Sequence, residues 1–568
     1  MQIQKAARQF LSEDLTISNF EDIEPYFADL LQRKIDAIDA FDKWLLDRSE
    51  LDAVLEEDLA WRYIKMSIDT ANEALRDSYT QFVTQIQPRL APLDDQLNEK
   101  LLASPFLKEK QDEAHYIYFR SIQTAKNLYR EENVAIEAAL SEEAQQYGAI
   151  SAAQQIEHRG QKLTMQQAAL LLKEQDEALR KEVFEKMAEA RRKDRAVLDA
   201  LFSSLIEKRH QLAVNAGFEN YRDYKFLAMG RFDYTKEDCF AFHEAIKTHI
   251  VPLVRSIQEK KLSFLGKDKF KPWDTEVDPE GKKALKPFDN GEQMLQGTIQ
   301  MFDQIDPYFG SCLRTMQMLG HLDLDSKPGK APGGYNYPLY EIGVPFIFMN
   351  AVGSQRDLET MVHEGGHAIH SFLSRELHLT AFKNIPSEVA ELASMSMELL
   401  SMPQWKHFYN NEDHKRAMRE QLEGTLKVLP WIAQIDAFQH WVYENPKHNL
   451  TDRALKWSEL SAEYGTGLTD WDGYTDLIES SWQRQLHLFE VPFYYIEYGI
   501  AQLGALGVWK NSLENYAQAI EQYKNALALG YTVPMNKIYQ TAGIPFDFSS
   551  ERLQSLAALL EAELKKLN

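Results

Sequence analysis

The sequence is poor in cysteine and in positive charge, and each shortage excludes a class of protein. Its two cysteines, Cys239 and Cys312, are too few for a disulfide framework or a thiolate zinc cluster. We expect two buried, inert thiols in a reducing compartment. The 63 lysines and arginines are outnumbered by 86 aspartates and glutamates, and the net charge of −23 argues against nucleic-acid and anionic-membrane partners.

Long apolar runs are also missing. No stretch approaches the roughly 20 consecutive apolar residues that cross a bilayer. The first residues reach acidic side chains before an apolar signal segment could form. We therefore expect a cytoplasmic protein with no membrane partner. What is present is 568 residues with 44% hydrophobic content, which indicates a large folded protein with more than one domain or subdomain.

Proline and glycine are scarce in the first 200 residues, which contain four prolines and two glycines. Apolar residues recur there at spacings of three and four, which predicts an almost entirely helical segment. Residues 342–350 are different, because they form a short aromatic and β-branched run bounded by turn residues. We predict a mainly α-helical protein with one small β-sheet, and helical periodicity resumes from Ser354.

The helix predicted after Ser354, a good N-cap residue, carries the strongest chemical signal. His363 and His367 stand one turn apart on one face, so their imidazoles can reach one cation. Glu364 follows the first histidine and can approach a water bound to that cation, which is the zincin pattern H-E-x-x-H. His370 shares this face and is more typical of a helix surface or of a residue that supports the ligands.

Two glycines, Gly365 and Gly366, interrupt this helix. Each costs roughly 1 kcal/mol relative to alanine, which indicates that another backbone approaches closely there. The approaching group could be a packing helix, a peptide substrate or the neighbour that carries a metal ligand.

A catalytic zinc ion needs three protein ligands and one open position. The glycine and histidine that continue the motif in metzincins are absent, so we expect a carboxylate from a later helix. Residues 384–400 supply Glu388, Glu391 and Glu398 at spacings of three and seven along one face. We choose Glu391 as the third ligand, and Glu388 or Glu398 would orient a ligand imidazole.

This site predicts hydrolysis with one Zn²⁺ per chain. The ion would lower the pKa of a bound water, and Glu364 would take the water's proton during attack on a carbonyl and pass it to the leaving amine. The developing oxyanion also needs hydroxyl or imidazole donors. A dense cluster of candidates lies in one later segment: His487, Tyr494, Tyr495 and Tyr498.

Four stretches together resemble a known family: HEGGHAIH, SEVAELASMSMELL, DAFQHWVYENP and HLFEVPFYYIEYGIAQLGALGVWKN. They are similar to the thimet-oligopeptidase superfamily of zinc metallopeptidases, and most of all to its bacterial oligoendopeptidase F and Pz-peptidase branch. The resemblance extends upstream to RHQLAVNAGFENYRDYKFLAMGRFDY and GGYNYPLYEIGVPFIFMN, so it covers roughly residues 205–525.

The resemblance implies a helical ellipsoid divided by a deep channel, with the zinc on its floor and the small sheet beside the zinc-binding helix. Such a channel admits short unstructured peptides and excludes folded proteins. The family's ligands, base and carbonyl-polarising groups fall on the residues already named, and one or more of Tyr494, Tyr495 and Tyr498 would face the zinc. The strand that ends in PFIFMN would offer its edge to the substrate backbone, with Phe348 and Asn350 as binding residues.

We therefore predict an N-terminal helical domain at 1–204 and a catalytic zinc metallopeptidase domain at 205–568, which acts as an endopeptidase on short peptides. A zinc carboxypeptidase of similar helical fold would need an anchor for the substrate C-terminus, and the sequence reveals none. A non-catalytic peptide-binding homologue would need no base such as Glu364 beside the metal. The oligomeric state does not follow from the sequence.

Overall fold

A computed structural model describes residue 3 and residues 5–567 of the chain. It is mainly α-helical with two small sheets, which confirms the predicted fold class. No helix among these described residues is both long and apolar enough to cross a membrane. The chain forms two units, each assembled from three separate segments. Unit 1 is Met1–Gln123, Ala284–Met418 and Gly504–Phe546, and unit 2 is Thr124–Lys283, Arg419–Leu503 and Asp547–Asn568.

The division expected at residue 204 does not coincide with either unit. Residue 204 lies inside α8 (Glu177–Asn215), one uninterrupted helix that belongs to unit 2. The expected boundary followed the start of the recognisable motifs. A helix needs no break at such a point, because its apolar spacing continues on both sides.

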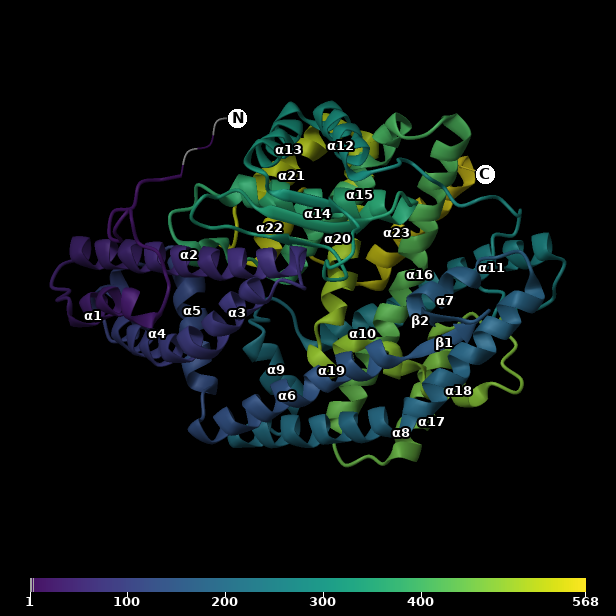
Figure 1. Ribbon diagram of the computed structural model, residues 1–568, viewed down its shortest axis with the longest axis horizontal. Coiled ribbons are helices and arrows are strands. Elements are labelled where there is room, and N and C mark those ends of the chain that lie inside the picture. The colour runs from purple at the N-terminus through teal and green to yellow at the C-terminus, as the bar shows by residue number, and fades with distance from the viewer. Residues whose placement is uncertain (1–2, 4, 568) are drawn as a thin grey trace. The chain divides into compact units, whose positions relative to one another are not determined.

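Unit 1 contains the helix predicted to bind the metal (Figure 1). Its elements are η1 (Phe20–Asp22), α1 (Glu24–Gln32), α2 (Ile38–Ile68), α3 (Glu73–Gln81), η2 (Phe82–Ile86), α4 (Gln87–Leu102), η3 (Pro105–Glu109), α12 (Gly291–Ile305), α13 (Pro307–Leu319), β3 (Leu322–Asp325), β4 (Tyr335–Tyr337), β5 (Phe346–Ala351), α14 (Gln355–Ser374), η5 (Thr380–Lys383), α15 (Ser387–Ser401), η6 (Met402–His407), α21 (Tyr516–Leu527) and α22 (Met535–Thr541).

Unit 2 is built around the long helix α8, and three helices have residues in both units. The unit 2 elements are α6 (Glu131–Ala153), β1 (Gln155–His158), β2 (Gln161–Thr164), α7 (Met165–Leu171), α8, α9 (Tyr221–Ala228), α10 (Lys236–Ala245), η4 (Ile246–Ile250), α11 (Val251–Leu265), α17 (Leu450–Tyr464), α18 (Thr475–Glu479), η7 (Ser481–Arg484), α19 (Leu486–Glu490) and α23 (Ser550–Lys566). The shared helices are α5 (Glu113–Leu128), α16 (Asn411–Glu444) and α20 (Tyr495–Glu514).

A β-hairpin interrupts the helical first 200 residues. Strands β1 and β2 pair antiparallel, and Arg159 and Gly160 connect them with φ angles of 51° and 76°. Two successive residues with positive φ are the mark of a tight hairpin turn that is usually built from Asn-Gly or Asp-Gly. We missed this hairpin because the turn pair here is Arg-Gly.

The predicted strand at 342–350 is present as β5, but it lies in the middle of its sheet. β3 pairs with it in parallel on one side, and β4 pairs with it antiparallel on the other. Both of its edges are therefore occupied by neighbouring strands. The expectation that β5 offers an edge to a substrate is wrong, and the outer edges of this sheet belong to β3 and β4.

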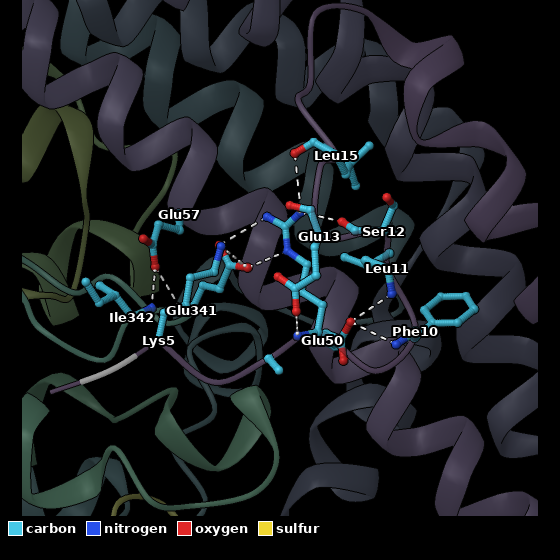
Figure 2. Close-up of polar contacts among 12 residues, drawn as sticks. Lys5, Phe10, Leu11, Ser12, Glu13, Leu15, Glu50, Glu57, Glu341 and Ile342 are labelled. Atoms are coloured by element: carbon cyan, nitrogen blue, oxygen red, sulfur yellow. Dashed lines mark hydrogen bonds and ion pairs between the residues drawn. The ribbon is translucent and has the colours of Figure 1, made fainter.

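Two carboxylates of α2 hold loops of unit 1 in place (Figure 2). Glu50 accepts hydrogen bonds from the backbone N–H groups of residues 9–11 at 2.8 to 3.1 Å, counting both of its oxygens. Glu57 Oε2 accepts from the N–H groups of Glu341 and Ile342 at 2.7 and 2.9 Å. Glu57 is 9% exposed and fixes the turn that leads into β5, so it supports the strand that precedes α14.

We predict that Glu57→Ala destabilises the protein by about 2 to 3 kcal/mol, because it leaves two backbone donors without their acceptor. Glu57→Gln should cost much less, since one amide oxygen can still accept from both N–H groups. Thermal unfolding measures the loss, and hydrogen exchange at Glu341 and Ile342 measures its local part. Glu56→Ala, at the neighbouring exposed position, is the matched control. An equal loss in the control would contradict the assigned role.

Candidate active site

Helix α14 presents the two histidines as the sequence predicts. It begins with a capping box, in which Ser354 Oγ accepts from the N–H of Asp357 at 3.2 Å and Asp357 Oδ2 accepts from the N–H of Ser354 at 2.8 Å. One turn separates His363 from His367, and their ring centroids lie 4.9 Å apart. Both side chains keep some exposure, at 23% and 19%, so this face of α14 is accessible.

The third donor comes from α15. Glu391 Oε2 lies 3.3 Å from His363 Nε2 and 3.9 Å from His367 Nε2. Donor atoms of these three residues lie within 4.8 Å of one another. Ser394 Oγ donates to Glu391 Oε2 at 3.0 Å and holds the carboxylate in this position. We call His363, His367 and Glu391 the histidine–glutamate cluster.

The two other carboxylates of α15 differ in their relation to the histidines. Glu398 Oε1 lies 2.7 Å from His363 Nδ1. This contact places the ring proton on Nδ1 and leaves Nε2 as the nitrogen that faces Glu391. Glu388 is buried, and the backbone oxygen of this residue accepts a hydrogen bond from Tyr539 Oη at 3.1 Å. Among the described residues, the group of donors close enough to share a cation includes Glu391 but neither Glu388 nor Glu398.

The two glycines of α14 face two different neighbours. A Cβ at Gly366 would lie 2.7 Å from both the carbonyl oxygen of Ala393 and the Cα of Ser394 on α15. A Cβ at Gly365 would lie 2.7 Å from the ring of Phe302 on α12. Gly366 therefore permits the close approach of α15, the helix that carries Glu391. Two of the expected alternatives, a packing helix and a neighbour that carries a metal ligand, are both met by α15.

Charges in the histidine–glutamate cluster suit cation binding. Burial lowers the pKa of His367 to about 4, so its imidazole is neutral and able to coordinate at neutral pH. Burial alone would raise the pKa of Glu391, but the hydrogen bond and charge of His363 outweigh it and lower the pKa to about 2. The same pairing, together with Glu398, raises the pKa of His363 against the opposing effect of burial.

Glu364 is the buried carboxyl beside this cluster. It is 7% exposed, and burial raises its pKa to about 7, with the positive charge of His363 opposing the shift. Asn336 of β4 donates from Nδ2 to the backbone oxygen of Glu364 at 3.4 Å and links this turn of α14 to the sheet. A carboxyl with a pKa near neutrality can both accept and release a proton.

His370 is a buried neutral residue. His370 is 2% exposed, and burial lowers the pKa of its imidazole to about 3. It is not among the donor atoms of the histidine–glutamate cluster. The alternative that His370 lies on the helix surface is therefore wrong, and its support of the ligands stays a prediction.

The two residues expected to bind substrate from β5 have structural contacts. Phe348 is fully buried, and its ring stacks on Tyr335 with centroids 4.9 Å apart. It is a core residue, so its assignment as a substrate contact is corrected. Asn350 Nδ2 donates to the backbone oxygens of Ala331 and Gly333 at 2.8 and 2.9 Å. Its side chain braces the loop between β3 and β4.

The predicted histidine and tyrosine donors gather within unit 2. The ring of His487 on α19 lies 4.8 Å from Tyr495, 5.9 Å from Tyr494 and 6.0 Å from Tyr498, measured between centroids. Burial lowers the pKa of His487, whose Nδ1 lies 2.6 Å from Gln485 Nε2. The histidine–glutamate cluster belongs to unit 1. The role of these four residues toward a substrate stays a prediction.

Two supporting residues, Ser394 and Asn336, were not predicted. Ser394 lies three residues after Glu391, a helical spacing at which side chains meet, so its support of the ligand was open to prediction. Asn336 lies in a loop-rich stretch of the sequence, and its contact with α14 depends on the sheet. No sequence signal identified it.

Two profiles of one known protein family match most of the sequence. The Peptidase family M3 profile matches residues 170–558, and the Peptidase M3 N-terminal domain profile matches residues 10–129. The first match covers well over half of the chain and contains the whole histidine–glutamate cluster. The chain belongs to Peptidase family M3.

Individual relatives agree with this assignment. The chain is 23% identical over 334 residues to group B oligopeptidase PepB of Streptococcus agalactiae, a match that covers 57% of this chain. It is 24% identical over 285 residues to oligopeptidase PepF of Bacillus subtilis, which covers 49% of this chain. The matched regions span 54% and 40% of those relatives' own lengths. The solved structure of Pz peptidase A with an inhibitor superimposes with a TM-score of 0.88 at 26% identity, over 98% of this chain and 99% of that one.

We predict that Gly366→Ala pushes α15 away from α14. Overpacking of this kind costs about 1 to 3 kcal/mol, and the displaced Glu391 should weaken the affinity of the cluster for a divalent metal ion about tenfold or more. Calorimetric unfolding and competition with a chromophoric chelator measure the two effects.

Gly424→Ala is the matched control, because this glycine also lies inside a helix, α16, but nothing lies within 4 Å of an added Cβ. The control should stabilise by up to about 1 kcal/mol through helix propensity. If Gly366→Ala behaved like this control, the close approach would not constrain the site.

Proposed function

We propose that the chain is a zinc-dependent endopeptidase that hydrolyses internal bonds of short, unstructured peptides. The main support for this proposal is that His363, His367 and Glu391 come together, with donor atoms within 4.8 Å of one another. Membership of Peptidase family M3 supports peptide-bond hydrolysis. The names of the two oligopeptidase relatives support short peptides as substrates.

The donor set of the histidine–glutamate cluster fits zinc. Two imidazoles and one carboxylate are a ligand set of catalytic zinc sites, which keep a fourth position for water or substrate. The contact between His363 and Glu398 adds the outer hydrogen bond that commonly orients a ligating imidazole. When bound, the ion would supply Lewis acidity, which lowers the pKa of a coordinated water towards neutrality.

Glu364 would move the proton during the reaction. Burial raises its pKa to about 7, which is close to the value that suits a general base at neutral pH. Its carboxylate would take a proton from the attacking water and then donate that proton to the nitrogen of the leaving amine. The neighbouring helix turns keep most solvent from this carboxyl, which is 7% exposed.

An extended substrate would add to the sheet at β4. This strand pairs with β5 on one side only, and Asn336 in its middle contacts the α14 turn that contains Glu364. Main-chain hydrogen bonds along a strand edge hold a peptide with little dependence on its side chains. This mode replaces the β5 edge, which neighbouring strands occupy.

Glu364→Gln should abolish peptide hydrolysis while the zinc content stays at about one ion at the histidine–glutamate cluster, because the amide cannot take a proton and the three ligands are intact. Elemental analysis together with a fluorogenic peptide assay tests this. Loss of zinc in the variant would mean that Glu364 is a ligand and that its assigned role is wrong.

A pair of α15 variants provides the contrast. Glu391→Ala should lose zinc and activity together, and Glu388→Ala should retain zinc. If Glu388→Ala lost the ion and Glu391→Ala kept it, the third ligand would be Glu388.

A peptide with an acetylated N-terminus and an amidated C-terminus should be cut at an internal bond, since endopeptidase action needs neither free end. Mass spectrometry of the products identifies the bond. The control is the same sequence with a free C-terminus. If only the free peptide were degraded, and by single residues from its end, the protein would be a carboxypeptidase.

A further inference from the structure

A second group of metal-binding side chains lies inside unit 2. Helix α10 carries Cys239 and His243 one turn apart, and α16 carries Asp436 and His440 one turn apart. Residues at this spacing share one helical face. Donor atoms of Cys239, Asp436 and His440 lie within 4.8 Å of one another, the same limit that the histidine–glutamate cluster meets. We call these three residues the cysteine–histidine cluster.

The cysteine–histidine cluster is closed to solvent. Cys239, Asp436 and His440 are 1%, 0% and 2% exposed. Around the imidazole of His440 stand Phe240 and Phe493, with ring centroids 4.9 and 5.4 Å away. These rings offer no hydrogen-bond acceptor to the imidazole of His440.

Several of these buried polar atoms lack a hydrogen bond. Asp436 Oδ1 and His440 Nδ1 have no partner, and His440 Nε2 lies 3.2 Å from Asp436 Oδ2 without hydrogen-bond geometry. Buried polar atoms are almost always paired, and an ion is one of the few explanations when they are not. The free atoms come from two residue types that bind metals, on one helix face.

The partners that do exist prepare the cluster for a cation. His243 Nε2 lies 2.8 Å from Asp436 Oδ2, which leaves Oδ1 available and gives the carboxylate the outer hydrogen bond that metal ligands usually have. Cys239 Sγ donates to the backbone oxygen of Thr235 at 3.4 Å, a weak thiol bond. Burial raises the pKa of Cys239, so the thiol keeps its proton until a cation displaces it.

We propose that Cys239, Asp436 and His440 bind a second zinc ion with a structural role, and that His243 positions Asp436. A sulfur ligand combined with imidazole selects zinc over magnesium or calcium, which prefer oxygen. The three residues are 0% to 2% exposed, so a substrate could not reach the ion, and its role would be structural. The ion would connect α10 to α16, whose residues His243 and Asp436 are 193 positions apart in the sequence.

To test the second site alone, the two histidines of the histidine–glutamate cluster are first replaced, so that any zinc that remains is bound elsewhere. In the full-length chain with His363→Ala and His367→Ala, elemental analysis after removal of loose metal should find about one zinc per chain. Adding Cys239→Ser should reduce this to less than about a tenth of an ion. Adding Cys312→Ser instead should leave it unchanged, because Cys312 is equally buried but lies on α13, outside the cluster.

Cobalt gives an independent reading of the sulfur ligand. Reconstitution of the same chains with Co²⁺ should produce a thiolate-to-cobalt charge-transfer band in the parent and in the Cys312→Ser variant, and no such band in the Cys239→Ser variant. If Cys239→Ser fails to fold, the zinc content and the cobalt spectrum of the parent, the chain with His363→Ala and His367→Ala, still test the proposal. A folded parent that binds neither zinc nor cobalt would overturn the proposal. The result does not depend on peptidase activity, so it is separate from the proposed function.

Discussion

The close approach of α14 and α15 is the constraint on which the candidate site depends. Two candidate ligands come from one helix and the third from the other, and close packing of the two helices brings Glu391 to 3.3 and 3.9 Å from the histidines. Gly366 allows this contact, because any side chain there would meet the backbone of Ala393 and Ser394. Tyr523 Oη on α21 donates a hydrogen bond to the backbone oxygen of Ala393 at 2.7 Å, which helps to hold α15 in place.

This constraint explains how much of the site the sequence could predict. His363, Glu364 and His367 follow from helical spacing alone, since their relation is set within two turns. The choice among Glu388, Glu391 and Glu398 is different, because all three lie on one face of α15. Only the point at which α15 crosses α14 separates them. The glycine at position 366 indicated that another backbone approaches α14, but it did not indicate which residue of α15 would lie opposite.

The sheet shows where prediction failed and why. The β5 run was found because its residues are apolar, aromatic and β-branched. Its place in the middle of the sheet depends on β3 and β4, which are short and lie in loop-rich sequence with little periodicity. A strand that is apolar throughout is typical of burial on both faces, so the burial of Phe348 was open to prediction from pattern, while the occupied edges were not. The two units escaped prediction for a similar reason, since each joins segments far apart in the chain.

The two clusters are built alike but differ in exposure. Each has two potential ligands one turn apart on one helix and completes the group from a second helix. His363 and His367 keep about a fifth of their surface, so water and a substrate can reach an ion bound there. Phenylalanine rings close the cysteine–histidine cluster, so an ion there could hold two helices together but could not meet a substrate.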